Sequence, residues 1–313
     1  MTGTTTIGVV GTGRMGSAMA QALRAAGVEV TLCNRTRATA EALASRIGAM
    51  CVTTPAEVAA AADITLTMLA DDAAVEAVYR GPDGVLAGAR AGGVLVDLST
   101  VTPDTIRSLE AEARAKGAGI LDAPVSGSVS LATSGQLTLM VGGAVEDLER
   151  ARPALGPLAK TIVHVGPLGS GAAMKLAVNT VIFGLNEAVA EGLVLAEAAG
   201  IDRELAYGVI ADSAVGAPYV QYKRAAFIDP ESLKTRGRIA LCPQGGPIYG
   251  YELSPEGATY IAGDSGVEFD CLVHGPAFAL LLWRNGRLDW DRAKLETSGP
   301  RPELGPTFAY MRF

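Results

Sequence analysis

Short apolar runs alternate with amphipathic stretches over about the first 165 residues of the chain. The apolar runs predict strands, and they cover residues 5–10, 28–33, 64–69, 94–98, 119–121, 137–141 and 161–165. The stretches with helical periodicity cover residues 14–26, 36–46, 72–79 and 103–115. Pro103, with Thr102 before it as the N-cap, marks the start of the last of these helices. This alternation is typical of an α/β fold with a doubly wound, parallel sheet.

A hinge-like break at residues 167–171 precedes one long apolar helix, expected from residue 170 to about 199 and ended by Gly200. Apolar residues fall on nearly all sides of this helix, which favours burial between domains or between subunits. Two further helices are expected at 202–213 and 217–227. The pattern thus predicts a first domain over residues 1–166 and an interdomain helix with the start of a helical domain over 167–230.

The chain changes character after residue 230. The last 83 residues contain 10 of the 16 aromatic residues but only seven alanines. Short strand-like runs broken by Gly and Pro cover residues 238–241, 249–253, 260–262 and 267–273, whereas residues 278–283 fit either a strand or a helix. Residues 231–313 are therefore expected to form an atypical C-terminal tail.

The first predicted strand leads into a glycine-rich turn and then into an alanine-rich helix. In this G-x-G-x-x-G turn, Gly11 permits a tight bend, Gly13 lets a phosphate approach the backbone, and Gly16 lets helix and strand pack closely, with Arg14 and Met15 between them. The free N–H groups and the dipole of a helix N-terminus favour a negative charge there. The first domain is therefore predicted to be a Rossmann-type dinucleotide-binding domain.

The end of the second predicted strand bears on the choice of cofactor. An NAD enzyme usually has Asp or Glu there, whereas this chain has Asn34, Arg35 and Thr36. A guanidinium can pair with a 2′-phosphate and stack on adenine. We expect NADP(H) to be preferred, with NAD(H) as the other option. In the alternative interpretation, Arg35 is a solvated residue and Thr36 is a helix cap.

Composition excludes several classes of partner. The 26 basic and 33 acidic residues give a net charge of −7, and no basic run stands out, so neither nucleic acid nor an anionic membrane is an expected partner. The four cysteines lack metal-site spacing, and the two histidines lie far apart in sequence, so no metal site is predicted. No signal-peptide pattern or long apolar span is evident, and the expected location is the cytoplasm.

Hydroxyl-bearing residues follow two of the predicted strands, at the edge of an α/β sheet where ligands bind. Ser99 and Thr100 can hydrogen-bond a nicotinamide or a substrate, although turn and capping chemistry before Pro103 explains this segment better when it is taken alone. Ser126, Gly127 and Ser128 lie in a turn that suits a carboxylate, or else in an ordinary strand-to-helix turn.

Lys175 and Asn179 lie one helical turn apart early in the long apolar helix. An apolar environment disfavours the charged ammonium form, which suits proton transfer near neutrality, and an amide can orient a substrate oxygen. Spacing alone leaves a lysine that snorkels at a helix start as an alternative. Leu69 and Ala70 end another strand and can line the adenine side, although generic strand-end packing explains them equally well. His164 is expected to be structural.

Taken together, these segments resemble the β-hydroxyacid dehydrogenase family, which includes 3-hydroxyisobutyrate dehydrogenases and glyoxylate/succinic semialdehyde reductases. The resemblance covers about residues 5–228, and the segments that carry it are GTGRMGSAMAQALRAAGVEVTLCNRT, MLADDAAVEAVYRGPDGVL, DLSTVTPDT, DAPVSGSVSLATSGQLTLMVGG and GPLGSGAAMKLAVNTVIFGLNEAVAEGLVLAE.

The resemblance implies hydride transfer between a nicotinamide cofactor and a small carboxylate substrate. It places the substrate carboxylate at Ser126, Gly127 and Ser128, and it makes Lys175, assisted by Asn179, the proton donor or acceptor. Imine reductases share the scaffold but commonly replace this lysine with Asp or Tyr. A homodimer or homotetramer built on the long helix is also implied.

The resemblance ends near residue 230. Family members continue with further helices, one of which carries a K-D-L segment whose lysine reaches the cofactor, and this chain has no K-D-L. A frameshift, a gene fusion or a chimera near residue 230 would each produce such a change. The second hypothesis is therefore a dinucleotide-binding protein with little or no turnover.

Overall fold

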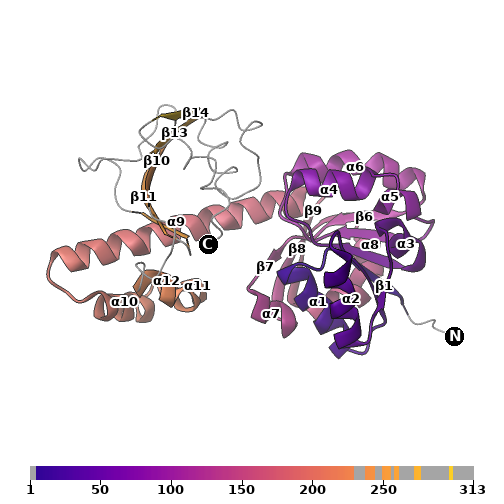
Figure 1. Cartoon of the computed structure of the whole chain (residues 1–313), viewed down its shortest axis with the longest axis horizontal. Coiled ribbons are helices and arrows are strands. Elements are labelled where there is room, and N and C mark those ends of the chain that lie inside the picture. The colour runs from indigo at the N-terminus through magenta and orange to yellow at the C-terminus, as the bar shows by residue number, and fades with distance from the viewer. Residues whose placement is uncertain are drawn as a thin grey trace. The chain divides into compact units, whose positions relative to one another are not determined.

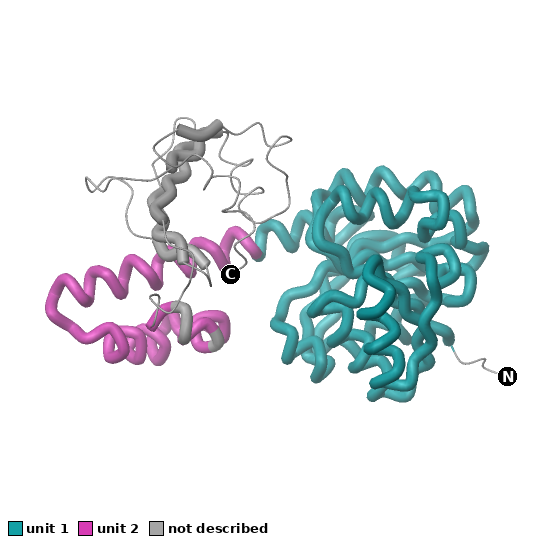
Figure 2. The backbone as a smooth tube through the Cα atoms, in the orientation of Figure 1, with its two compact units in different colours: residues 1–178 teal, residues 179–313 magenta. Residues whose placement is uncertain are grey.

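The computed structural model describes residues 5–228 and five strand segments, at 237–243, 249–254, 257–260, 271–275 and 296–298. The chain forms two compact units, residues 1–178 and 179–313, and their boundary falls inside the long helix α9 (Ser170–Ala198) (Figure 2). The domain limits expected at residues 166 and 230 stay predictions.

A nine-stranded sheet forms the centre of the first unit (Figure 1). Its strands are β1 (Ile7–Val10), β2 (Val30–Cys33), β3 (Met50–Cys51), β4 (Ile64–Thr67), β5 (Val94–Asp97), β6 (Gly119–Asp122), β7 (Val125–Ser126), β8 (Leu137–Gly143) and β9 (Ala159–Gly166). Their order is β3-β2-β1-β4-β5-β6-β8-β7, with β9 paired to β8. The predicted Rossmann-type doubly wound fold is confirmed.

The sheet is not parallel throughout, which corrects one expectation. Strands β1 to β6 pair in parallel, but β8 runs antiparallel to β6 and β7. A parallel strand needs a long crossover, usually a helix. Only β7 and the five-residue helix α7 (Val129–Thr133) lie between β6 and β8, so the chain turns back and β8 enters in the opposite direction.

Helices cover both faces of the sheet. Besides α7, they are α1 (Arg14–Ala25), α2 (Arg37–Ile47), α3 (Pro55–Ala61), α4 (Asp72–Arg80), α5 (Val85–Gly88), α6 (Pro103–Ala115), α8 (Val145–Leu155) and the 3₁₀ turn η1 (Gly156–Leu158). The four helices predicted in this region are confirmed to within about one residue. Helix α3 is not among the predicted helices, although Thr54 and Glu57 form a capping box around Pro55.

Two apolar cores separate the helices by sheet face. One core joins the sheet to α1, α2, α7 and α8, and the other joins it to α3, α4, α5 and α6. Successive strand residues point to opposite faces. Val94 and Val96 accordingly belong to the first core and Leu95 to the second, so both faces of β5 are buried.

The carboxyl ends of the central strands are aligned. Val10 of β1 pairs with Thr67 of β4, Thr67 pairs with Asp97 of β5, and Asp97 pairs with Asp122 of β6. Because these strands are parallel, the loops that follow them all leave the sheet at this one edge.

The described residues of the second unit include the rest of α9 and the helices α10 (Arg203–Asp212), α11 (Pro218–Tyr222) and α12 (Arg224–Ile228). The single helix expected at 217–227 is therefore two helices, with Lys223 between them. A small core stabilises this unit, and it consists of Val189, Ala190, Leu193, Ala206, Tyr207, Val220 and Phe227. Burial along all of α9 is not observed within one chain, because Val181 and Leu195 are 70% and 74% exposed.

The strand segments beyond residue 236 form a second sheet. They are β10 (Gly237–Pro243), β11 (Tyr249–Ser254), β12 (Gly257–Tyr260), β13 (Cys271–Gly275) and β14 (Glu296–Ser298), in the order β12-β11-β10-β13-β14. The runs predicted at 238–241 and 249–253 are strands. Of the runs predicted at 260–262 and 267–273, residue 260 belongs to β12 and residues 271–273 to β13, and the rest lie outside the described residues. Residues 278–283 lie outside the described residues.

Candidate functional site

The three glycines of the G-x-G-x-x-G turn meet three different geometric demands. Gly11 has a φ of +94°, which strongly favours glycine, and a Cβ there would lie 2.3 Å from the carbonyl oxygen of Met68. A Cβ on Gly16 would lie 1.9 Å from the carbonyl oxygen of Gly11. Gly13, in contrast, is exposed and has no atom within 4 Å of a Cβ built on it. Two glycines therefore close the turn, and the third leaves its outer side open.

The open side of the turn is the N-terminus of α1. Gly13 is the N-cap residue, no side chain caps the helix, and the first turn carries no acidic residue. The first N–H groups of a helix have no intrahelical partner, and the helix dipole makes this end positive. An uncapped N-terminus under open space fits the pyrophosphate of a dinucleotide.

The end of β2 is tied to the glycine-rich turn by one side chain. The amide oxygen of Asn34 accepts a hydrogen bond from the Thr12 N–H at 3.0 Å, and its nitrogen donates to the Thr36 carbonyl at 3.1 Å. Arg35 and Thr36 are exposed. Arg35 makes no hydrogen bond or ion pair within the described part of the chain, and the Thr36 side chain does not cap α2 although Thr36 is its N-cap residue. Arg35 and Thr36 are therefore both accessible to a ligand, and Arg35 is the one that carries a charge.

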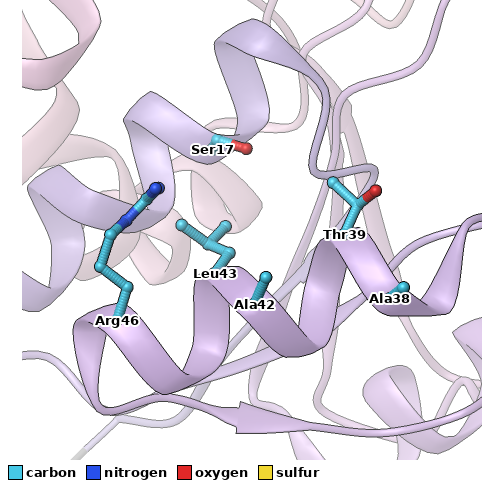
Figure 3. A pocket seen from close by; sticks show the side chains of 6 residues that line it. All are labelled: Ser17, Ala38, Thr39, Ala42, Leu43 and Arg46. Atoms are coloured by element: carbon cyan, nitrogen blue, oxygen red, sulfur yellow. The ribbon is translucent and has the colours of Figure 1, made fainter.

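A pocket of about 520 Å³ lies between α1 and α2 (Figure 3). Its lining residues are Ser17, Ala38, Thr39, Ala42, Leu43 and Arg46. Figure 3 shows Arg46 extending from α2 toward α1. One lining residue, Ser17, directly follows Gly16 of the glycine-rich turn. None of the predicted site residues lines the pocket.

Asp97 ends β5 and is buried, with 1% of its surface exposed. One carboxylate oxygen accepts hydrogen bonds from the hydroxyls of Thr67 at 2.5 Å and Ser99 at 3.2 Å, and the other accepts the Ser99 N–H at 2.9 Å. Burial raises the pKa of Asp97 to about 6, and the nearby Asp122 carboxylate adds to this rise, against the effect of the three hydrogen bonds.

This raised pKa predicts a pH-dependent stability. The folded state holds the Asp97 proton more tightly than the unfolded chain, so the stabilisation is complete below about pH 4 and lost as the pH rises through about 6. Asp97→Asn cannot ionise. Urea unfolding should show that the free energy of unfolding of the unmutated chain falls, relative to this variant, by roughly 3 kcal/mol over that interval.

The exposed Asp83 gives a matched control for that measurement. An Asp83→Asn variant should follow the unmutated chain through the whole interval. Parallel stability curves for the unmutated chain and Asp97→Asn would contradict the assigned role of Asp97.

Ser99 connects two loops at the sheet edge. Its hydroxyl accepts the Leu69 N–H at 2.9 Å and donates to Asp97, and the residue is 1% exposed. Thr100 is also buried, at 5% exposure, whereas Ala70 is exposed. The structure therefore directs the Ser99 hydroxyl inward, where it supports the 69–70 segment.

Thr102 and Asp72 make a second connection between these loops. Thr102 is the N-cap residue of α6 as predicted, but its side chain does not cap that helix. Its hydroxyl and its N–H instead donate to one oxygen of the buried Asp72 carboxylate, at 2.8 and 2.9 Å. The Thr105 hydroxyl donates to the same oxygen at 2.5 Å. The starts of α4 and α6 are held together in this way.

The 126–128 segment follows β6 and leads into α7. Gly127 has a φ of +143°, and its Cβ would lie 2.7 Å from the Leu137 side chain. The Ser128 hydroxyl accepts the Leu131 N–H at 3.4 Å and so caps α7. Ser126 is half-buried at the end of β7. Turn and cap chemistry is thus present, and it leaves the Ser126 hydroxyl and the exposed Gly127 available to a ligand.

Lys175 and Asn179 lie on α9, four residues apart and both half-buried. The first turn of α9 is attached to the sheet edge, because the Asp122 carboxylate accepts the N–H groups of Gly169 and Ala172 at 2.7 and 2.6 Å. His164 contacts the Gly143 carbonyl through Nε2 at 2.8 Å, in keeping with a structural histidine.

Asp97 and Asp122 are not among the predicted site residues, although each lies in a segment that carries the family resemblance. A signal was present, since each is an acidic residue that directly ends an apolar strand. In neighbouring parallel strands this pattern places two carboxylates side by side.

No helix within the described residues has the length and hydropathy needed to cross a membrane.

Comparison with known proteins matches two successive parts of the chain to dehydrogenase family models. Residues 6–166 match the family model described as the NAD-binding domain of 6-phosphogluconate dehydrogenase. Residues 169–243 match the model described as NAD-binding of NADP-dependent 3-hydroxyisobutyrate dehydrogenase. This second match continues past residue 228, where the resemblance was expected to end.

Two curated relatives illustrate the similarity. Glyoxylate/succinic semialdehyde reductase 2 of Arabidopsis thaliana is 37% identical over 72% of this chain, and the alignment spans 63% of that protein. The 2-(hydroxymethyl)glutarate dehydrogenase of Eubacterium barkeri is 38% identical over 71% of this chain and 73% of its own length. The chain thus spans about two thirds of the length of these relatives.

Solved structures show the same similarity. The 3-hydroxyisobutyrate dehydrogenase of Mycobacterium tuberculosis, described with L-serine, is 33% identical, with a TM-score of 0.64 over 74% of this chain and 81% of that one. Psf3 in complex with NADP+ is 29% identical, with a TM-score of 0.66 over 70% and 78%.

Proposed function

Since this chain belongs to the β-hydroxyacid dehydrogenase family, we propose that it is an NADP(H)-dependent oxidoreductase that interconverts a small hydroxyacid and its semialdehyde or oxo acid. Lys175 is the proton donor in the direction of reduction and the acceptor in the direction of oxidation. The semialdehyde and hydroxyacid enzymes among the relatives support this substrate class.

The residues that hold the cofactor surround the carboxyl edge of the sheet. The open N-terminus of α1 receives the pyrophosphate, and the accessible guanidinium of Arg35 receives a 2′-phosphate. The proposed cofactor-binding residues are Gly11, Gly13, Arg14, Met15, Gly16, Asn34, Arg35, Thr36, Leu69, Ala70, Ser99 and Thr100. Asn34 and Ser99 act by holding the backbone of neighbouring loops. When bound, the reduced nicotinamide supplies a hydride to the substrate carbon.

Different residues bind the carboxylate end and the carbonyl end of the substrate. The substrate carboxylate is received by the hydroxyl of Ser126, by main-chain N–H groups of Gly127 and Ser128, and by Thr100. The ammonium group of Lys175 donates a proton to the carbonyl oxygen as the hydroxyl forms, and the amide of Asn179 orients that oxygen. The contribution of these residues is mainly positioning together with one proton transfer.

The attachment of α9 is the observation that carries this proposal. Its first turn, directly before Lys175, is hydrogen-bonded to Asp122 at the end of β6. The glycine-rich turn follows the end of β1 at the same edge of the parallel sheet. The candidate proton donor and the candidate phosphate site thus lie on one edge of one unit.

NADP(H) preference predicts a specific role for Arg35. A charge-assisted bond to the 2′-phosphate contributes about 1.5–3 kcal/mol, which is on the order of 10- to 100-fold in affinity. Arg35→Ser should weaken NADPH binding by that factor and leave NADH binding almost unchanged, as measured by titration of the reduced cofactor's fluorescence. Arg37→Ser is the matched control, because Arg37 is also exposed but pairs with Glu41 at 2.6 Å. An equal loss for both cofactors would contradict the assignment.

Turnover tests the proposal as a whole. NADPH consumption should be measured with glyoxylate, succinic semialdehyde and tartronate semialdehyde as separate substrates. Oxidation of NADPH by at least one of them is the expected result. The matches to known families end at residue 243, which favours the second candidate, a dinucleotide-binding protein with little turnover. Tight NADPH binding without consumption by any of these compounds would support that alternative.

A further inference from the structure

The first turn of α9 lacks a local cap. Its N-cap residue is Gly169, which has no side chain to accept the free N–H groups of the turn. The Asp122 carboxylate, which comes from the end of β6, takes this role. One oxygen accepts the Gly169 N–H at 2.7 Å, and the other accepts the Ala172 N–H at 2.6 Å. A residue 47 positions away in sequence thus caps the helix.

The packing around this carboxylate leaves no room for adjustment. A Cβ on Gly142 would lie 2.3 Å from one Asp122 oxygen. A Cβ on Gly171 would lie 2.9 Å from the other oxygen and 2.3 Å from the Met140 carbonyl oxygen. Asp122 itself is 1% exposed. Two glycines therefore allow the helix turn to sit directly against β6 and β8.

Arg107 of α6 holds the segment just before α9. Its Nε donates to the Leu168 carbonyl at 3.1 Å, and a Cβ on Gly169 would lie 2.7 Å from that same nitrogen. Burial raises the pKa of Asp122, while the N–H groups of Ala172 and Gly169 and the charge of Arg107 oppose this effect. The turn is thus held from two sides, by β6 and by α6.

We propose that Asp122 is a positioning residue that sets Lys175 relative to the substrate-binding segment, an inference that rests on the function proposed above. Asp122 stands four positions before Ser126 on one side, and its partner Ala172 stands three positions before Lys175 on the other. One carboxylate therefore connects the segment that receives the substrate carboxylate with the helix turn that carries the proton donor.

A carboxylate suits this position better than an amide. Asp122 presents two acceptor oxygens to two N–H donors. An asparagine has one acceptor oxygen and would turn an NH₂ group toward the second donor. The positive end of the α9 dipole also favours the negative charge. Asp122→Asn should therefore loosen the turn without creating a cavity.

The test compares Asp122→Asn with Asp147→Asn in the full chain. Asp147 is a matched control, because it is also buried, pairs with Arg114 and Arg150, and would contact a Cβ at Gly119, the opposite end of the same strand. Three kinds of measurement are made for each variant. They are kcat and KM for the compound, among the three named above, that the unmutated chain reduces fastest; Kd for NADPH; and hydrogen exchange of a peptide covering residues 167–178.

Asp122→Asn should lower kcat by tenfold or more, speed exchange of the 167–178 peptide by about tenfold, and leave Kd for NADPH within about twofold. Asp147→Asn should change none of these beyond about twofold. The same kcat and exchange rates in both variants would overturn the inference. If the unmutated chain turns over no substrate, the proposed function fails and the catalytic part of this inference fails with it. Unchanged exchange in Asp122→Asn would refute the capping role on its own.

Discussion

Replacing Lys175 with alanine should lower kcat for semialdehyde reduction by about 10²- to 10⁴-fold, the usual contribution of a positioned acid or base. The substrate oxygen gains a proton as hydride reaches its carbon, and without the ammonium group only water is left to supply that proton. The loss should appear in steady-state NADPH consumption. Binding of NADPH should stay within about twofold, because Lys175 does not belong to the proposed cofactor site.

Lys160→Ala is the control for this experiment, because Lys160 is an exposed lysine on β9 of the same unit. It should leave kcat unchanged. Equal activity of Lys175→Ala and the unmutated chain would remove Lys175 from the mechanism, whereas a parallel loss of NADPH binding would indicate a structural role instead.

Gly13→Asp should change folding stability and cofactor binding in opposite directions. Gly13 has the extended backbone of an N-cap residue, with φ −66°, and a Cβ would meet nothing within 4 Å. A carboxylate there can accept the free N–H groups of α1 and interact with the helix dipole, which should stabilise the fold by about 0.5–1 kcal/mol. The same carboxylate occupies the expected phosphate position, where like charge costs several kcal/mol and weakens binding by on the order of 100-fold or more.

Thermal unfolding and NADPH titration measure the two effects separately. Gly13→Asn is the matched variant, since it adds a cap of similar size without the charge and should weaken binding less than Gly13→Asp. Unchanged NADPH affinity in Gly13→Asp would show that the dinucleotide does not bind at this helix end. A loss of stability would show that the end of α1 is not open in solution.

Much of the first unit follows from patterns that are local in sequence. The strands β1, β2, β4, β5 and β6 are short, mainly apolar runs that are buried almost throughout, so their hydrophobicity identifies them. The glycine-rich turn is also predictable from the sequence, because the bend itself leaves no room for a side chain at Gly11 or Gly16. In contrast, the antiparallel entry of β8 depends on how little helix lies before it, a feature that apolar periodicity does not report.

The hydrogen bonds of the site are harder to predict from the sequence than the positions of its residues at the strand ends. Ser99 follows β5 and Thr102 is the N-cap residue of α6, but their partners Leu69 and Asp72 lie 30 residues away in sequence. The same holds for Asp122, whose partners on α9 become neighbours only when the sheet and the helix are assembled. Residue types and strand ends indicate where ligands bind, whereas tertiary packing decides which hydroxyls and carboxylates remain available to them.

The two hydrogen bonds of Asn34 constrain how cofactor preference can evolve or be engineered. An acidic residue at the end of β2 is the usual route to NAD, and Asn34→Asp would introduce it with a change of only one atom. The aspartate would keep the bond from the Thr12 N–H but lose the donor to the Thr36 carbonyl, and would place a charge against that oxygen. If the proposed NADP preference holds, a change toward NAD is expected to start at Arg35, because Arg35 has no such partners among the described residues. Substitution of Asn34 is expected only after the backbone around Thr36 has changed.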